Sequence, residues 1–261
     1  MSALLELAGI GISFGGLRAV DDLSFAVEEG QIVALIGPNG AGKTTVFNMI
    51  TGVYRPNGGK ILWYDHDITG LAPHRIARLG IMRTFQTIRL FSDMSVFENV
   101  RAGCHLRTRQ HWWQGLASVP SQRREEADIA DRTSDILKRL DLETVANERA
   151  IALPYGAQRR VELARTLIAN PKMMILDEPA AGLNDRESEK LNETIFGIRD
   201  SGITVLLVEH DMNVVMNVTD HIVVINFGRK IAEGNAATIR NDPQVIEAYL
   251  GRDDDDAEVA A

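Results

Sequence analysis

The sequence predicts an α/β fold in which helices cover a parallel sheet, and three observations lead to that prediction. A glycine-rich loop at residues 37–44 follows a short apolar run and precedes a segment without helix breakers. From residue 172 onward, strand-like apolar runs alternate with helical segments, which is typical of parallel sheets. Residues 87–169 are instead polar and rich in helical signals, which indicates an inserted helical subdomain.

The glycine-rich loop fits the pattern G-x-x-x-x-G-K-[S/T] of phosphate-binding loops in nucleoside triphosphatases. Residues 31–36 read as a buried strand and residues 44–50 as a helix, which is the context that the motif requires. Lys43 is predicted to reach the β- and γ-phosphates, Thr44 to hold Mg²⁺, and Thr45 to lie near the α-phosphate. The predicted nucleotide-binding residues of this loop are Gly37, Pro38, Asn39, Gly40, Ala41, Gly42, Lys43, Thr44 and Thr45.

The remaining elements follow from the pattern of apolar residues. Residues 4–36 read as short strands, and Leu23, Phe25 and Val27 alternate with smaller side chains, as in a half-buried strand. In chain order, the further expected elements are strands at 58–64 and 81–85 with a short helix at 74–78, a helix at 123–140, strands at 172–176, 203–208 and 221–225, and helices at 188–198 and 213–218.

Two acidic residues, Asp177 and Glu178, close one of these apolar strands. Ligands of parallel sheets bind beyond the carboxyl ends of the strands, so both acids are expected beside the phosphate loop. Asp177 is placed to bind the Mg²⁺ that Thr44 holds, and Glu178 to act as the general base toward the attacking water.

Three further residues are candidates, and two of them, His210 and Phe14, have a structural alternative. His210 follows the strand at 203–208 and would contact the γ-phosphate, although a histidine there is more often structural. Gln86 follows the strand at 81–85 and would sense Mg²⁺ or the lytic water. Phe14 would stack on adenine, or it belongs to the core. The predicted catalytic residues are therefore Glu178, His210, Gln86 and Lys43, and the predicted metal ligands are Thr44, Gln86 and Asp177.

Composition limits the classes of function. The chain has 261 residues, 45% of them hydrophobic, which is enough for one large α/β domain. No apolar run approaches the ~18 to 20 residues of a membrane helix, no secretion signal is visible, and Cys104 is the only cysteine. The net charge of −8 argues against non-specific nucleic-acid binding, and we assign no function to the acidic tail at 252–261.

Residues 153–165, with the sequence L-P-Y-G-A-Q-R-R-V-E-L-A-R, resemble the signature of ATP-binding cassette (ABC) proteins, L-S-G-G-Q followed by an arginine-bearing helix. The absence of an N-K-x-D motif argues against a GTPase. The motifs that occur in the family's order over residues 4–251 are Phe14, residues 37–45, Gln86, the signature, Asp177 with Glu178, residues 181–184, and His210.

The resemblance implies a phosphate-loop NTPase with a RecA-like parallel-sheet core, an N-terminal antiparallel β subdomain and an inserted helical subdomain at about 87–169. It implies ATP and Mg²⁺ as cofactors. It also implies that two cassettes sandwich two ATP molecules, so that the signature residues Pro154, Tyr155, Gly156 and Ala157 face the partner's ATP. The second cassette would be a further copy of this chain or a sister subunit, and the sequence leaves both open.

The same resemblance implies work at a membrane. Closure on ATP and reopening after hydrolysis would drive integral-membrane permease subunits, which residues 87–100 would contact. The chain would then be a cytoplasmic protein, peripheral on the inner face of the cell membrane, with no nucleic-acid partner. Further segments are similar to the ATP-binding subunits of branched-chain amino acid importers, which also work with a solute-binding protein. These segments are residues 14–17, 83–86, 89–91, 178–184, 242–243 and 248–251, with the polar insert near 105–124.

The signature departs from the family pattern at two positions. Pro154 stands where serine is usual, and Ala157 stands where Gln or Glu is usual. Proline offers neither the hydroxyl nor a backbone N–H, so the phosphate donors that remain are the N–H groups of Tyr155, Gly156 and Ala157. Two hypotheses stay open: the site hydrolyses ATP more slowly than its sister site, or the backbone donors suffice.

Other functions are compatible with parts of the sequence. One alternative is a cassette for another cargo, such as urea, an amide or an exported lipid, since related cassettes serve such solutes. A soluble cassette acting on DNA or ribosomes would carry a coiled-coil insertion or a second cassette, and this chain has neither. A degenerate scaffold is disfavoured by intact Lys43, Asp177, Glu178 and His210. Trp112 and Trp113 lie among arginines and would face a membrane or permease, or pack inside the helical subdomain.

Overall fold

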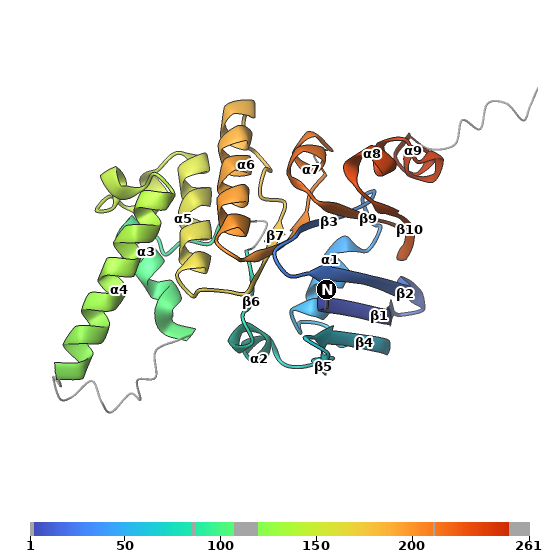
Figure 1. The fold of residues 1–261 in the computed structure, drawn as a ribbon, viewed down its shortest axis with the longest axis horizontal. Coiled ribbons are helices and arrows are strands. Elements are labelled where there is room, and N and C mark those ends of the chain that lie inside the picture. Colours follow the sequence, from blue (N-terminus) through green and yellow to red (C-terminus); the bar gives the residue numbers. More distant parts are fainter. Residues whose placement is uncertain (1–2, 85–86, 107–119, 211, 251–261) are drawn as a thin grey trace, which may run out of the picture.

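The computed structural model describes residues 3–84, 87–106, 120–210 and 212–250, and shows two sheets with helices around them (Figure 1). The first sheet has the strand order β2-β1-β4-β5, and the second has the order β10-β9-β3-β8-β7-β6. The main elements in chain order are β1 (Ala3–Phe14), β2 (Leu17–Glu28), β3 (Ile32–Ile36), α1 (Lys43–Ile50), β4 (Gly58–Trp63), β5 (His66–Asp67), α2 (Pro73–Arg78), β6 (Ile81–Arg83), α3 (Val96–Ala102), α4 (Pro120–Arg139), α5 (Tyr155–Leu167), β7 (Met173–Asp177), α6 (Asp185–Asp200), β8 (Thr204–Val208), α7 (Met212–Val218), β9 (His221–Asn226), β10 (Arg229–Gly234), α8 (Ala236–Arg240) and α9 (Pro243–Leu250).

The second sheet contains the parallel core that the sequence predicted, with β10 added antiparallel to β9 at one edge. β3 pairs in parallel with β8 and β9, and β7 pairs in parallel with β8 and β6. β3, β7 and β8 are buried at every position, because a parallel sheet is covered on both faces and its strands are therefore apolar throughout. The parallel direction brings the carboxyl ends of β3, β7 and β8 to one edge of the sheet.

The two faces of β3 pack against different layers. Val33 and Leu35 join a cluster with α1 and the antiparallel sheet, while Ala34 and Ile36 join a cluster with α7, α8 and α9. This division follows from the alternation of side chains along a strand. The helix that begins at Lys43 is therefore enclosed between the two sheets, and the phosphate loop is fixed at its start.

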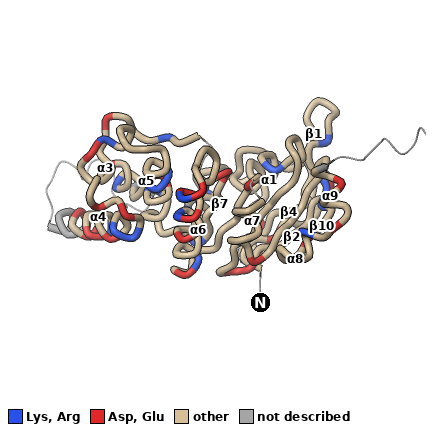
Figure 2. The backbone as a smooth tube through the Cα atoms, turned by 90° about the horizontal axis from the view of Figure 1, so that it is seen from above, with Lys and Arg blue, Asp and Glu red and all other residues tan. Residues whose placement is uncertain are grey.

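The helical subdomain lies at one end of the molecule, where α3, α4 and α5 pack together (Figure 1). α3 begins with a capping box in which Ser95 Oγ accepts the N–H of Glu98 and the Glu98 carboxylate accepts the N–H of Ser95. Acidic and basic residues are interspersed along α4 and α6 (Figure 2). Among the described residues, no helix is both long and apolar enough to cross a membrane.

The structure differs from the sequence prediction near the two ends of the chain and in the helical subdomain. β1 and β2 are twelve residues each and not short strands, because their pairing continues through several register shifts that interrupt the simple alternation. α3 was not predicted, since its seven residues are too few to show a helical period. β10, α8 and α9 were also not predicted as elements.

Candidate nucleotide-hydrolysis site

The phosphate loop links the carboxyl end of β3 to the first residue of α1, as the motif predicted. Two of its glycines are required by their surroundings. A Cβ on Gly37 would lie 2.0 Å from the carbonyl oxygen of Ile225, and a Cβ on Gly42 would lie 2.7 Å from the carbonyl oxygen of Ala19. Gly42 also has a φ of 104°, which side-chain-bearing residues rarely adopt. The loop can therefore take this path only with glycine at both positions.

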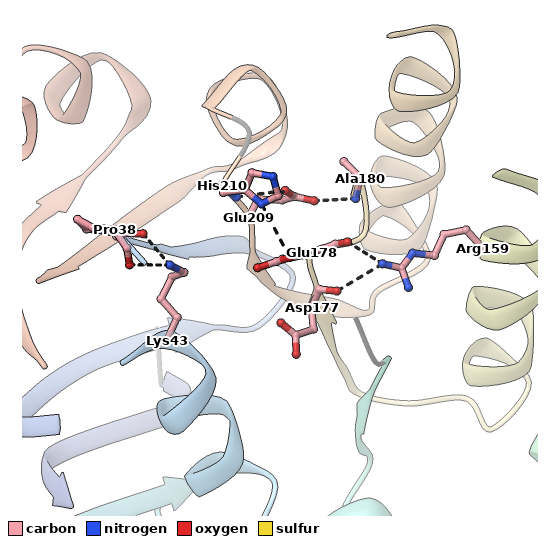
Figure 3. A network of polar contacts seen from close by, with 9 residues as sticks. Pro38, Lys43, Arg159, Asp177, Glu178, Ala180, Glu209 and His210 are labelled. Carbon is pink, nitrogen blue, oxygen red and sulfur yellow. Dashed lines mark hydrogen bonds and ion pairs between the residues drawn. The ribbon is translucent and has the colours of Figure 1, made fainter. Parts of the chain in front are cut away.

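Lys43, the first residue of α1, is a buried cation with 9% of its surface exposed. Its Nζ donates to the carbonyl oxygen of Gly37 at 2.6 Å and to that of Pro38 at 3.0 Å (Figure 3). Burial lowers the pKa of Lys43, while the charges of Glu178 and Asp177 act in the opposite direction. Lys43 therefore lies within electrostatic reach of both predicted acids. Thr44 is exposed and Thr45 half-buried, so the Thr44 hydroxyl is accessible to a ligand at this loop.

Asp177 ends β7 and is nearly buried, and its carboxylate is held by Arg83. Arg83 Nη2 lies 2.6 Å from Asp177 Oδ2, and Arg83 Nη1 donates to Asn48 Oδ1 at 2.7 Å. The pair joins the end of β7 to the end of β6 and to α1. Arg83 lies in one of the segments that resemble the importer subunits, but no sequence signal gave it a partner.

Glu178 follows at the sheet edge with a φ of 47°, an uncommon conformation for a residue with a side chain. Its N–H donates to the carbonyl oxygen of Val208 at 2.8 Å. Its Oε2 lies 3.9 Å from His210 Nδ1, and the His210 side chain is 59% exposed. The structure therefore brings together Lys43, Asp177, Glu178 and His210, as the sequence predicted.

Glu209 is a buried acid that sequence reasoning did not single out. Its side chain is fully buried; Oε1 accepts the N–H of Ala180 at 2.6 Å, and Oε2 accepts the N–H of His210 at 3.2 Å (Figure 3). It thereby ties the segment after Glu178 to the segment that carries His210. A buried carboxylate that accepts backbone N–H groups is a strong anchor, because its charge strengthens each hydrogen bond.

Arg159 is a second residue that the sequence pattern did not single out. It lies on α5, is 1% exposed, and donates to the carbonyl oxygens of the segment that carries both acids (Figure 3). Its Nη1 also lies 2.7 Å from the Oε2 of Glu162, which is equally buried. The only sequence hint was an arginine within the signature segment, and nothing in the pattern indicated that it points inward.

Phe14, the predicted adenine contact, lies in the antiparallel sheet. Phe14 ends β1, is 42% exposed and contacts the ring of Tyr54 edge-on at 5.2 Å, so it is not a core phenylalanine. Gln86, predicted as a catalytic residue and a metal ligand, lies outside the described residues. The same holds for Trp112, Trp113 and the acidic tail.

The signature lies away from the phosphate loop of its own chain. α5 and α1 lie on either side of β7 in both views (Figures 1 and 2). Pro154 is the N-cap of α5 and makes no side-chain capping bond. The N–H of Ala157 donates to the carbonyl oxygen of Pro154 at 2.9 Å, which removes it from the donors that were expected for a phosphate. The N–H groups of Tyr155 and Gly156 remain as the candidates.

A cavity of about 500 Å³ opens between the core and the helical subdomain. Arg165 and Phe91 form part of its wall, with the Arg165 guanidinium 5.7 Å from the ring centroid. Burial lowers the pKa of Arg165, and the nearby charge of Glu162 raises it. Arg83 lines the same cavity, so this groove and the Asp177 carboxylate share one residue.

Comparison with known proteins agrees with this geometry. The family model of the ABC transporter matches residues 20–181, and the model described as branched-chain amino acid ATP-binding cassette transporter matches residues 229–255. The high-affinity branched-chain amino acid transport ATP-binding protein BraF of Pseudomonas aeruginosa is 47% identical over 249 residues, which are 95% of this chain and 98% of that protein. The corresponding protein LivG of Escherichia coli (strain K12) shows the same identity and coverage.

Solved structures agree as well. A nucleotide-free ATP-binding cassette from an ABC transporter superposes with a TM-score of 0.83 at 31% identity, covering 96% of this chain and 100% of its own. The ADP conformation of such a cassette superposes with a TM-score of 0.84 at 30% identity, covering 97% of this chain and 100% of its own. The chain therefore belongs to the ABC transporter family and is one of its ATP-binding, ATP-hydrolysing cassettes.

Proposed function

We propose that this ATPase powers an importer of branched-chain amino acids. The observation that carries the proposal is the 47% identity to BraF and LivG over 95% of the chain, together with the branched-chain-specific match at residues 229–255. The second match supports the cargo, because it falls outside the region that matches the ABC transporter family in general.

Within the site, each residue has a proposed role. Lys43 holds the β- and γ-phosphates, and the exposed hydroxyl of Thr44 and the carboxylate of Asp177 are the oxygen ligands for Mg²⁺, a donor set that suits this hard cation. Bound Mg²⁺ neutralises phosphate charge. Glu178 accepts a proton from the attacking water, and His210, close to the Glu178 carboxylate, orients toward the γ-phosphate. Gln86 is proposed to contact the metal or the water.

The proposal includes partners that complete the machine. A second cassette places its signature against the ATP held by this chain, and this chain's Tyr155 and Gly156 do the same for the partner. Integral-membrane permease subunits dock in the groove lined by Arg165 and Phe91 and along residues 87–100, which keeps the chain peripheral on the inner face of the cell membrane. A solute-binding protein acts on the outer side of the membrane and makes no direct contact with the cassettes.

The test uses tagged Glu178→Gln chain, expressed in its native cell and trapped with ATP and Mg²⁺. Cross-linking followed by mass spectrometry is expected to recover two multi-span permeases and a cassette. The companion solute-binding protein is expected to bind leucine, isoleucine or valine in a calorimetric screen. A binding protein that takes urea or amides would overturn the cargo alone. Recovery of soluble partners or nucleic acid without permeases would overturn the transport role and leave the ATPase chemistry intact.

A further inference from the structure

The Arg159 guanidinium is hydrogen-bonded to the backbone of the segment that carries Asp177 and Glu178. Nε of Arg159 donates to the carbonyl oxygen of Pro179 at 3.1 Å, and Nη2 donates to the carbonyl oxygens of Glu178 at 2.6 Å and Asp177 at 3.4 Å. One guanidinium therefore contacts three consecutive carbonyls of a segment that is distant from it in sequence. These contacts come from the opposite side of the backbone to the carboxylates (Figure 3).

The Arg159 guanidinium is fully buried and paired. Both Arg159 and Glu162 are 1% exposed, and they form an ion pair at 2.7 Å one helical turn apart on α5. A buried charge is tolerated when it is paired and its remaining donors are satisfied, and Glu162 with the three carbonyls meets that condition. The planar, forked arrangement of N–H groups suits arginine and cannot be reproduced by lysine.

These hydrogen bonds fix the direction of the Glu178 side chain. A carbonyl that is held in place fixes its peptide plane, and the planes on both sides of a residue determine where its Cβ points. Glu178 needs this support because it has a left-handed backbone conformation that the chain does not favour by itself. From the other side, Glu209 holds the N–H of Ala180 at 2.6 Å. The segment 177–180 is therefore clamped between α5 and the residue that precedes His210.

α5 also carries the signature at its N-terminus. Tyr155 begins this helix and is 42% exposed, and Arg159 follows about 6 Å along the axis at ~1.5 Å per residue. The exposed start of α5 and the clamp on Glu178 are thus parts of one rigid helix. A ligand at the signature end and the carboxylate of Glu178 are connected through a single buried side chain.

We propose that Arg159 is a positioning residue that holds the Glu178 carboxylate in its hydrolytic orientation and couples it to the signature end of α5. This inference rests on the proposed role of Glu178 as the general base. A residue of this kind should affect turnover without affecting nucleotide binding. It should also matter only while Glu178 is present, because it acts through Glu178.

The test is a double-mutant cycle in the assembled transporter, with Arg159→Lys and Glu178→Gln alone and together. Arg159→Lys is expected to lower kcat for ATP by about tenfold to a hundredfold, since small displacements of a reacting group have effects of this size. Binding of a fluorescent ATP analogue to the purified chain is expected to change less than about twofold, because the phosphate loop is untouched. In the Glu178→Gln background, Arg159→Lys is expected to add less than about a twofold loss.

The matched control is Arg160→Lys, which makes the same change at the next residue of the same helix. It is expected to leave kcat within about twofold of the wild type. A second route to the clamp is Arg159→Gln with Glu162→Gln, which removes both buried charges together and avoids a lone buried ion if Arg159→Lys does not fold. The loss of kcat in this double variant is likewise expected only while Glu178 is present.

The outcomes distinguish a failure of the positioning role of Arg159 from a failure of the general-base role of Glu178. If Arg159→Lys lowers kcat by the same factor in the wild type and in the Glu178→Gln background, Arg159 is only structural and its positioning role is overturned. A fall in nucleotide affinity that matches the fall in kcat would overturn it as well. Wild-type turnover in the single variant Glu178→Gln would overturn the role of Glu178 itself, and this is visible before any change at Arg159. Slow turnover in Glu178→Gln with full turnover in Arg159→Lys would overturn the positioning role alone.

Discussion

The Arg83 side chain contacts parts of the molecule that are distant in the sequence. Its guanidinium pairs with Asp177, donates to Asn48 on the phosphate-loop helix, and lies 5.7 Å from the ring centroid of Phe47. It also lines the groove beside the helical subdomain. An occupant of that groove would therefore touch a residue that holds the proposed Mg²⁺ ligand.

Replacing Arg83 with Met tests the value of this pair. The side chains of Arg83 and Asp177 are 11% and 8% exposed, and removing one partner of a buried pair leaves an uncompensated charge. We expect the free energy of unfolding to fall by about 3 kcal/mol, at the low end for such pairs because Lys43 keeps a positive charge near Asp177. Urea unfolding at neutral pH without nucleotide measures this change.

The control for that variant is Arg132→Met. Arg132 pairs with Asp128 at 2.9 Å, but both side chains are more than half exposed, so the loss should be at most about 1 kcal/mol. Saturating ATP with Mg²⁺ should recover part of the Arg83→Met loss, because the bound metal replaces the missing positive charge. Equal losses in the Arg83 and Arg132 variants would contradict a stabilising role for the buried pair of Arg83 and Asp177.

At the scale of elements, α6 depends on its first residues. Asn184 Oδ1 accepts the N–H of Glu187 at 3.0 Å, and the Glu187 carboxylate accepts the N–H of Asn184 at 3.1 Å. Asn184→Ala removes the first of these bonds and should lower the free energy of unfolding by about 1 kcal/mol. Asn184→Asp keeps an acceptor at the cap and should change it by less than about half that amount. Thermal or urea unfolding distinguishes the two variants.

The start of α5 allows a complementary prediction. Pro154 is its N-cap without a side-chain capping bond, so a serine there would supply the missing acceptor. We expect Pro154→Ser to be more stable than Pro154→Ala by about 1 kcal/mol in urea unfolding, since both lose the proline constraint and only serine caps. The ATP turnover of the same two variants in the assembled complex then decides between the open hypotheses for the signature. A rise with serine alone supports a slow site, and no change supports sufficient backbone donors.

The positions of Lys43, Asp177 and His210 at one edge of the sheet could be predicted, because local motifs and the parallel direction of β3, β7 and β8 place them there. Arg83 and Asp177 could not be paired, since they are 94 residues apart and meet only when β6 and β7 align. The inward direction of Arg159 was equally hidden, because charge in a helical pattern usually indicates a solvated face.

At the scale of the whole molecule, the predicted nucleotide-contacting residues of this chain lie in two separate places. The phosphate loop, Asp177 and Glu178 lie in the core, while the exposed start of α5 lies in the helical subdomain on the other side of β7 (Figure 1). The Arg139 guanidinium donates to the carbonyl oxygen of Gly197 at 2.8 Å, which ties α4 to α6 and so the subdomain to the core. For one chain to close its own signature over its own phosphate loop, the helical subdomain would have to move relative to the core and break contacts such as this one.

Hydrogen exchange can detect this division directly. In the isolated wild-type chain, ATP with Mg²⁺ is expected to slow exchange in residues 37–50 and 177–180, because ligand contacts oppose local opening there. Residues 154–158 are expected to exchange at an unchanged rate in that sample. In Glu178→Gln chain at a concentration that yields a trapped cassette pair, residues 154–158 should also become protected, since the partner's ATP then covers the start of α5. Lys43→Ala should show neither change, because it weakens nucleotide binding itself. Protection of residues 154–158 in a monomeric sample would contradict the two-cassette site, since it would require the signature to serve the nucleotide of its own chain.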